Sequence, residues 1–552
     1  MPRAIELIRE GKNKELWQMC CGFLNLSIDE FMNVQERLLG KQLELLSNSV
    51  IGKKIMGGAR PQTVGEFREM VPLTTYKDYC PELIEKIEDI LPVKPYEWVH
   101  TSGRSGEYPC KWIPLTADFL QEMSVISFGI AILSTCKEWG DTSKVVECPR
   151  IINAMAPRPY MSGAMGYMLD LQVPSRFMPP LDGMDSLSFE DRVQLGFKQA
   201  LSQGLDGFCG LSLVLVKIGE RFREASNKAS VLPYVKQPRA ALRLARGLLK
   251  SKIARRPMLP RDLWTVRGII SGGLDSWVYK DKIMEYWGRY PLDVYVGSEG
   301  GVYATQTWDY EGMTFVPNLN FFEFIPEDEL LKWEMDRSYR MKTLLMNEVK
   351  AGEKYEIVMT NFHGGAMIRY RPGDMVRITS LRNEKLGIDI PQMVFEQRVD
   401  GLLDFVFVRL TEKTIWEAIE STGIPYEDWI AYKKDGEAVL SLFIELKDDS
   451  QENVDAIARA IYKHVTESQI EAESLIPDEY ARMIGFRVET TILPRGTFAS
   501  YTTRRQAEGA DLAHLKPPHI QPSQETITLL VAKPERVRAV VTPENQDETV
   551  SV

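Results

Sequence analysis

Between about residues 100 and 380, short apolar runs rich in β-branched residues alternate with helix-like patterns and Gly/Pro turns. Leu292–Val296 (LDVYV) and Glu356–Thr360 (EIVMT) are two such runs. This alternation constrains the fold most strongly, because it predicts a mixed α/β body. Before it, residues 28–46 space their apolar side chains three and four apart, which predicts a helix. Phe128–Cys136 is too short to cross a membrane and is predicted to be buried.

The pattern restarts after about residue 400, in a stretch of ordinary domain size. Strands are predicted at 404–410, 438–447 and 487–493, and helices at 412–422 and 452–468. The sequence therefore predicts two α/β domains. Residues 1–399 form a large domain of mixed sheets and helices, and residues 400–552 form a smaller one.

Composition excludes several classes of protein. With 44% apolar and 26% charged residues, the 552-residue chain is neither disordered nor fibrous. A net charge of −10 disfavours nucleic acid as a partner. Seven cysteines without a C-x-x-C pair and five scattered histidines indicate neither a disulfide framework nor a zinc site. The N-terminus lacks the apolar stretch of a signal peptide, so a cytoplasmic location is expected.

Residues 236–261 differ in charge from the rest of the chain, because they carry nine Lys/Arg and no acid. On a helix, Arg239, Arg243, Arg246 and Lys250 form one stripe, opposite Leu244, Ala245, Leu248 and Leu249. A solvated helix face is the simplest interpretation. Weak contact with a membrane surface or a protein partner is the alternative.

A Ser/Gly-rich segment, TSGRSGEYPCK at residues 101–111, is the strongest local signal for chemistry. Small residues let backbone N–H groups approach an anion, and the terminal lysine can neutralise it. The segment is not a Walker A loop. Ser271–Ser276 (SGGLDS) is an alternative phosphate loop that resembles the one in ATP pyrophosphatases, although it also fits a plain strand-to-helix turn.

Three later segments add polar groups. Tyr295–Glu299 ends a predicted strand with a ring, a hydroxyl and a carboxylate, which suit an adenine and Mg²⁺. Arg369–Asp374 places an acid after a turn, and Gly509–Lys516 places a lysine beside prolines. Each has a structural explanation as well: Glu299 as an acid at a helix start, Arg371 with Asp374 as a surface ion pair, and Lys516 as a solvated charge.

Together and in this order, these segments resemble the acyl-adenylate-forming superfamily of acyl-CoA synthetases, peptide-synthetase adenylation domains and luciferases. Within it the chain is most similar to the auxin-responsive acyl acid amido synthetases. Four stretches follow that family's patterns: Phe67–Tyr79 (F-R-x-x-V-P-x-x-x-Y-x-D-Y), Phe321–Pro326 (Y-F-E-F-x-P), Pro391–Arg398 (P-x-F-x-F-x-x-R) and Gly509–Lys516 (G-A-S-x-x-Q-Y-K spacing).

The resemblance implies ATP and Mg²⁺ as cofactors and a C-terminal domain that moves between half-reactions. The residues it places at the ATP phosphates are Thr101, Ser102, Gly103, Arg104, Ser105, Gly106 and Lys111. It places Tyr295 against the adenine, Ser298 and Glu299 beside the nucleotide with Glu299 on Mg²⁺, Asp374 on the ribose hydroxyls and Arg398 near the ribose. Asp400 would be the hinge and Lys516 the catalytic lysine.

The predicted activity is therefore ATP-dependent activation of a carboxylic acid, followed by amide formation with an amino acid. Arg104 stands where the family has threonine, and His514 replaces a glutamine. Residues 361–365 (NFHGG) also differ from the family's T-Y-A-G-L, at the acceptor end of the pocket. Two alternatives remain: an acyl-CoA ligase, which would use CoA as acceptor, and a non-catalytic nucleotide-binding relative in which Arg104 fills the phosphate site.

Overall fold

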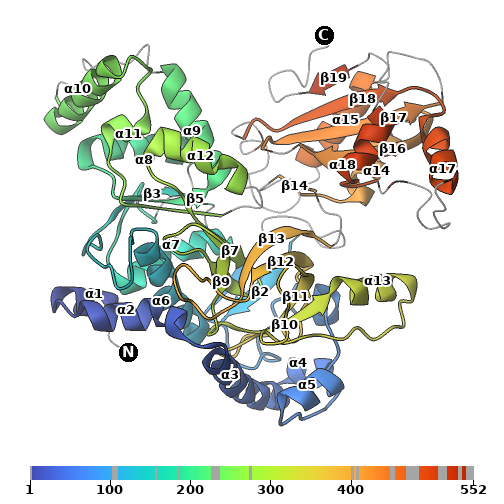
Figure 1. Cartoon of the computed structure of the whole chain (residues 1–552), viewed down its shortest axis with the longest axis horizontal. Helices are drawn as coiled ribbons and strands as arrows, with labels where there is room; N and C mark the ends of the chain where they lie inside the picture. Colours follow the sequence, from blue (N-terminus) through green and yellow to red (C-terminus); the bar gives the residue numbers. More distant parts are fainter. Residues whose placement is uncertain are drawn as a thin grey trace. The chain divides into compact units, whose positions relative to one another are not determined.

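The computed structural model divides the chain into two compact units, shown in Figure 1. One comprises Met1–Thr101 and Lys111–Val399, and the second comprises Ser102–Cys110 and Asp400–Val552. The description excludes residues 1–2, 102–109, 156–157, 183–186, 188, 226–235, 273–275, 400–402, 406–408, 435, 448–453, 468–480, 482–483, 508–516, 518, 532–537 and 542–552. That the first unit binds ATP and the second is mobile stays a prediction.

An 11-stranded sheet forms the centre of the first unit, in the order β10-β11-β12-β13-β9-β8-β7-β6-β5-β3-β4. Its strands are β3 (Arg150–Ala154), β4 (Arg176–Met178), β5 (Gly207–Leu211), β6 (Gly268–Gly272), β7 (Leu292–Gly297), β8 (Gly301–Thr305), β9 (Met313–Phe315), β10 (Asn320–Pro326), β11 (Lys354–Asn361), β12 (Asp374–Ser380) and β13 (Gln392–Arg398). The strands from β4 to β7 pair in parallel, whereas those from β7 to β10 pair antiparallel. β7 is thus the strand at which the parallel half meets the antiparallel half. The mixed α/β class and the strands predicted within β7 and β11 are confirmed.

Helices surround this sheet (Figure 1). They are α1 (Ala4–Arg9), α2 (Asn13–Cys21), α3 (Ile28–Asn48), α4 (Val50–Ile55), α5 (Val64–Met70), α6 (Ala117–Leu133), α7 (Met161–Gln172), α8 (Phe189–Gln203), α9 (Ser212–Ala225), α10 (Pro238–Ile253), α11 (Pro260–Leu263), α12 (Ser276–Trp287) and α13 (Glu327–Met335), with 3₁₀ turns η1 (Gly22–Asn25) and η2 (Tyr76–Tyr79). Helix α3 confirms the predicted helix, and a capping box between Ser27 and Glu30 fixes its start. Much of the predicted apolar segment 128–136 is buried in α6. In the part of the chain that is described, no helix has the length and apolarity needed to cross a membrane.

The basic segment forms α10 as expected, but the predicted division of its faces is partly wrong. Leu244 is buried, whereas Ala245 and Leu249 are exposed, and Arg243 is half-buried. The reason is that the buried seam uses the small residues Gly247 and Ser251, which a search for large apolar side chains passes over. A Cβ at Gly247 would lie 2.5 Å from Leu263 Cδ2, so the glycine permits close packing on α11.

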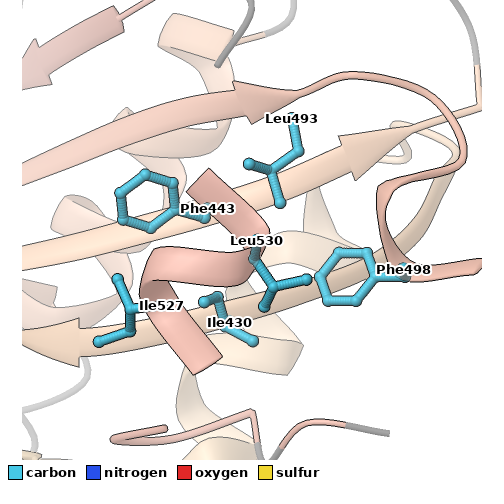
Figure 2. Close-up of a cluster of buried hydrophobic side chains, with 6 residues drawn as sticks. All are labelled: Ile430, Phe443, Leu493, Phe498, Ile527 and Leu530. Carbon is cyan, nitrogen blue, oxygen red and sulfur yellow. The ribbon is translucent and has the colours of Figure 1, made fainter. Parts of the chain in front are cut away.

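The second unit contains a four-stranded sheet in the order β16-β17-β18-β19. Its elements are β14 (Leu403–Asp404), β15 (Arg409–Leu410), β16 (Tyr426–Lys433), β17 (Val439–Leu446), β18 (Arg487–Leu493), β19 (Arg538–Val541), α14 (Glu412–Ser421), α15 (Val454–Glu467), α17 (Thr497–Ala507) and α18 (Gln524–Val531). The strands predicted at 438–447 and 487–493 and both predicted helices are confirmed. Ile430, Phe443, Leu493, Phe498, Ile527 and Leu530 form one of its apolar clusters (Figure 2).

The single strand predicted at 404–410 is wrong. β14 pairs antiparallel with β15, so the chain reverses between them. An apolar run indicates extended backbone but does not locate a reversal.

His519 of the second unit lies between two carboxylates. Its Nδ1 lies 2.5 Å from Glu412 Oε1, and its Nε2 lies 2.7 Å from Asp428 Oδ1. Its ring stacks on Trp429 at 4.5 Å. Burial acts to lower the pKa of His519, but the two carboxylates outweigh it and raise that pKa.

Candidate active site

A β-hairpin sets the position of Lys111. Strands β1 (Glu97–His100) and β2 (Trp112–Leu115) pair antiparallel, and the predicted phosphate segment connects them. Thr101 N–H donates to the Lys111 carbonyl at 3.1 Å, and Lys111 N–H donates to Thr101 Oγ1 at 3.1 Å. These two bonds continue the hairpin by one residue pair. They fix the backbone from which the lysine side chain extends.

The Lys111 ammonium lies beside a carboxylate and a phenol. Its Nζ donates to Glu299 Oε1 at 3.2 Å and to Tyr370 Oη at 2.9 Å, and Tyr370 O–H donates to the same carboxylate oxygen at 3.2 Å. The lysine and glutamate side chains are only 11% and 10% exposed. This nearly buried triad joins a hairpin, the β7–β8 turn and the segment before β12.

Electrostatics keep Glu299 ionised despite its burial. Burial, the largest single influence, acts to raise its pKa, but the Lys111 ammonium, a backbone hydrogen bond and the Arg398 charge together outweigh it and hold the pKa of Glu299 below its ordinary value. Burial and the nearby Glu299 carboxylate raise the pKa of Tyr370 well above its ordinary value. The tyrosine therefore stays a neutral hydrogen-bond donor at neutral pH.

A second ion pair lies on the neighbouring strands. Tyr295 O–H donates to Asp374 Oδ2 at 2.6 Å, and Arg398 Nη1 donates to Asp374 Oδ1 at 2.7 Å. Arg398 Nη2 also donates to the Pro372 carbonyl at 2.9 Å. Burial and the Asp374 charge raise the pKa of Tyr295 well above its ordinary value. The tyrosine is a permanent donor that orients the aspartate.

Tyr303 on β8 connects the two ion pairs. Its ring centroid lies 4.8 Å from that of Tyr295, and its pKa is raised by burial and then by the charges of Glu299 and Asp374. Its hydroxyl is buried without a hydrogen-bond partner among the described residues. A Cβ at Gly297 would lie 2.6 Å from that hydroxyl, and one at Gly300 2.4 Å from the ring, so both glycines give the ring its space.

The segment Phe67–Tyr79 holds Tyr370 in place. Thr74 N–H donates to the Arg369 carbonyl, and Arg371 N–H donates back to the Thr74 carbonyl, each at 2.9 Å. Arg369 forms a buried ion pair with Glu323 of β10 at 2.7 Å, and its Nη1 donates to the Val71 carbonyl. Three stretches that carry the sequence resemblance therefore meet at the segment before β12.

Residues 361–365 are held by hydrogen bonds, one of which reaches the backbone of Glu299. Asn361 Nδ2 donates to the Glu299 carbonyl at 3.0 Å, and Gly364 N–H donates to Gln42 of α3 at 2.9 Å. His363 Nε2 lies 2.8 Å from the Asn318 carbonyl. The segment that departs from the family pattern therefore contacts the backbone of a predicted site residue.

Two of the structural explanations for these residues are wrong. Glu299 lies in the turn between β7 and β8 and not at a helix start, because no helix follows the strand. Arg371 pairs with Glu356 at 2.7 Å, whereas Asp374 pairs with Arg398, so the two do not form a surface ion pair. In the alternative phosphate loop, buried Ser271 lies 2.7 Å from the Ser212 hydroxyl and donates to Asp293.

Several predicted site residues lie outside the described residues. They are Ser102, Gly103, Arg104, Ser105, Gly106, Asp400, His514 and Lys516. The described ones gather in one place on the first unit: Thr101, Lys111, Tyr295, Glu299, Asp374 and Arg398, with half-buried Ser298 next to them in sequence.

Sequence reasoning missed Tyr370 and Tyr303 as members of the site, and it considered Asn361 only as part of the segment 361–365. Tyr370 had a local signal, since it stands four residues before the predicted aspartate. Tyr303 has none, because a tyrosine in an apolar strand is an ordinary residue, and nothing in the segment 361–365 indicates that Asn361 binds the Glu299 backbone. Their roles come from contacts with distant segments.

The oxygen donors of the site can be compared with those that Mg²⁺ usually binds. Across the described part of the chain, no cluster of three or more His, Cys, Asp or Glu residues forms a metal cage. Mg²⁺ commonly binds one or two carboxylates together with substrate phosphates and waters. Ionised Glu299 fits that mode, and the unpartnered Tyr303 hydroxyl nearby offers a further donor for a polar ligand.

The fold is that of an acyl acid amido synthetase. A solved structure titled AtGH3.15 acyl acid amido synthetase in complex with 2,4-DB superposes with a TM-score of 0.51 and 15% identity, covering 96% of this chain and 98% of that one. Residues 21–148 match the GH3 family N-terminal domain, and residues 313–398 match the GH3 family central domain. These two stretches of the chain are thus similar to the N-terminal and central domains of the GH3 family, and the resemblance inferred from the motifs is confirmed.

Two curated relatives share part of this sequence. A jasmonoyl–L-amino acid synthetase of Nicotiana attenuata is 35% identical over 164 residues, which are 29% of this chain and 26% of that one. A 4-substituted benzoates–glutamate ligase of Arabidopsis thaliana is 26% identical over 234 residues, 39% of this chain and 38% of that one. The matches thus span well under half of either relative.

Proposed function

We propose that the protein activates a carboxylic acid with ATP as an acyl-adenylate and transfers the acyl group to an amino acid. The observation that carries the proposal is the Lys111–Glu299–Tyr370 triad beside the Asp374–Arg398 ion pair and its donor Tyr295, within a chain that matches two GH3 family domains. Both named relatives join an acid to an amino acid, which supports an amide product.

In the first step the acid's carboxylate oxygen forms a bond to the α-phosphorus of ATP, and pyrophosphate leaves with the electron pair of the broken P–O bond. Negative charge increases on the phosphoryl oxygens, so fixed cations are the main catalytic need. Lys111 provides one at the end of the hairpin, and Glu299 would hold Mg²⁺, which supplies further positive charge. Asp374, oriented by Tyr295 and Arg398, accepts hydrogen bonds from the ribose.

In the second step the amine nitrogen forms a bond to the acyl carbon, AMP leaves as the anion, and the amine gives up a proton. No protein nucleophile is needed, so the site requires positioning rather than an activated serine or cysteine. In this proposal residues 361–365 lie at the end of the pocket that receives the amino acid, and Asn361 connects them to Glu299 through its hydrogen bond to the Glu299 carbonyl. The seven free cysteines suit the cytoplasmic location that belongs to the proposal.

Hydroxylamine trapping of the acyl-adenylate tests the proposal. The protein is incubated with Mg²⁺-ATP and a panel of aromatic, fatty and jasmonate-like acids, and the hydroxamate is measured. Lys516→Ala is expected to lower the signal by about 10²–10³-fold, the effect of losing one charge-stabilising donor. Lys447→Ala removes an exposed lysine of the same unit and serves as the matched control.

Other outcomes would overturn parts of the proposal. ATP binding without an acid-dependent product favours the non-catalytic relative. AMP release that requires CoA and ignores amino acids favours the acyl-CoA ligase. Loss of adenylation in Ser271→Ala together with a mild effect of Lys516→Ala would favour the alternative phosphate loop.

A further inference from the structure

Helix α10 is fixed to the first unit along one side. Ala240, Leu244, Gly247 and Ser251 form its buried seam, and the helix packs on α8 and α11. Arg243 Nη1 donates to the carbonyls of Ala200 and Leu201 at the end of α8. After the helix, Arg256 binds Asp262 through two hydrogen bonds, at 2.7 and 2.8 Å. The orientation of α10 about its own axis is therefore set.

The side opposite the buried seam is apolar. Leu242, Leu249 and Ile253 are 52%, 60% and 74% exposed. An α-helix turns by about 100° per residue, so these three lie within roughly 40° of one another, about half a turn away from the seam. We call them the outer ridge. Three large aliphatic side chains exposed along one line of a helix indicate a surface that binds an apolar partner.

Cations flank the outer ridge. Arg239, Arg246 and Lys250 lie along one side of it, and Lys252 lies along the other. All four are exposed, and among the described residues none of them forms an ion pair. Two other basic residues of this segment, Arg243 and Arg256, bind within the fold instead. Four cations that form no ion pair among the described residues thus lie beside the ridge.

We propose that the outer ridge of α10 docks on the surface of a lipid bilayer rich in anionic headgroups. The charges select this partner, because the segment from 236 to 261 carries nine Lys/Arg and no acid while the whole chain is net negative. Leucine and isoleucine enter the boundary of the acyl region, and the long basic side chains reach sideways to the headgroups.

The length of the helix agrees with peripheral docking. Sixteen residues measure about 24 Å, and the helix lies in the plane of the surface with three apolar anchors. One such row gives weak, reversible binding that depends on anionic lipid and falls with added salt. This inference does not rest on the proposed acyl-activating function.

Vesicle co-sedimentation tests the inference with the full chain. We expect binding to vesicles of phosphatidylcholine with phosphatidylserine, little binding to pure phosphatidylcholine, and loss of binding at high salt. The ridge variant Leu249→Ser/Ile253→Ser should lower the partition coefficient by roughly tenfold, since both side chains are about half exposed or more before binding. Replacing Arg239, Arg246 and Lys250 by Gln should lower it about fivefold per cation.

Matched controls exclude a general effect. Leu331→Ser/Met335→Ser removes two exposed apolar side chains from the acidic helix α13, at 52% and 82% exposure, and should leave vesicle binding unchanged. Thermal unfolding and light-scattering mass are measured for every variant. The proposal is overturned by equal binding of the ridge variant and the parent, by no binding of the parent to anionic vesicles, or by a parent dimer that the ridge variant dissociates.

Discussion

Replacing Lys111 by Met should destabilise the protein, because it leaves a carboxylate buried without its cation. The Glu299 side chain is 10% exposed, and its pKa stays low through the ammonium 3.2 Å away. Removing one partner from a buried ion pair costs about 3–5 kcal/mol. Tyr370 O–H still donates to the carboxylate, so we expect the lower end of that range.

The cost should depend on pH with a defined sign. In the parent, the lowered pKa of Glu299 stabilises the fold above the ordinary glutamate range, and this stabilisation is lost as pH falls through the folded-state value. In Lys111→Met, burial dominates and raises the pKa of the same carboxyl, so the variant becomes relatively more stable as pH falls. The difference in unfolding free energy is therefore largest near pH 7 and smaller near pH 4.5.

Urea unfolding at both pH values measures this difference, and a second substitution isolates its cause. Lys111→Met/Glu299→Gln removes the stranded charge and should regain most of the lost stability while adenylation stays low. The control Lys385→Met breaks an exposed pair, with side chains 60% and 69% exposed, and should cost about 1 kcal/mol or less. The reasoning fails if Lys111→Met costs no more than this control, or if the double variant is as unstable as the single one.

Three further substitutions have defined outcomes. Tyr303→Phe removes a buried hydroxyl without a partner, so the unfolding free energy should rise by about 1 kcal/mol while ATP affinity falls; a loss of stability in urea would contradict this. His519→Gln should destabilise the protein more at pH 5.5 than at pH 8. The raised pKa of the histidine stabilises the fold fully below its unfolded value near 6.5, and this stabilisation is lost as pH rises through the folded value. Equal shifts of the melting temperature at both pH values would contradict this explanation. Arg369→Met strands Glu323 and should cost about 3–5 kcal/mol, whereas Arg369→Met/Glu323→Gln should recover much of it in the same urea assay.

The sequence predicts those parts of the fold that local patterns encode. Helix α3 and strands β7 and β11 have their own periodicity, so each could be placed without knowledge of its neighbours. Strand order could not be predicted, because β13 pairs with β9 across about 80 residues of chain. The exposed face of α10 was misassigned because glycine and serine form its buried seam.

The same limit applies to the site. Glu299 and Asp374 stand at strand ends in recognisable segments, and their types suggest their chemistry. The sequence does not show that Lys111 pairs with the first and Arg398 with the second. Tyr303 escaped notice because its importance depends on two glycines that give its ring space against Tyr295. Long-range partners, rather than residue types, were the missing information.

The described cluster is balanced in charge, and this has a consequence for the proposed chemistry. Lys111 offsets Glu299, and Arg398 offsets Asp374, so these four groups add no net positive charge to attract a triphosphate. A polyanion gains little from a neutral cluster, and the additional cations must come from elsewhere. Within the resemblance, the candidates are Mg²⁺ on Glu299, the predicted catalytic Lys516, and Arg104, which stands where the family has a neutral threonine. We therefore expect Arg104 to compensate the charge of the phosphates rather than to block their site, and Arg104→Thr to weaken ATP binding rather than improve it.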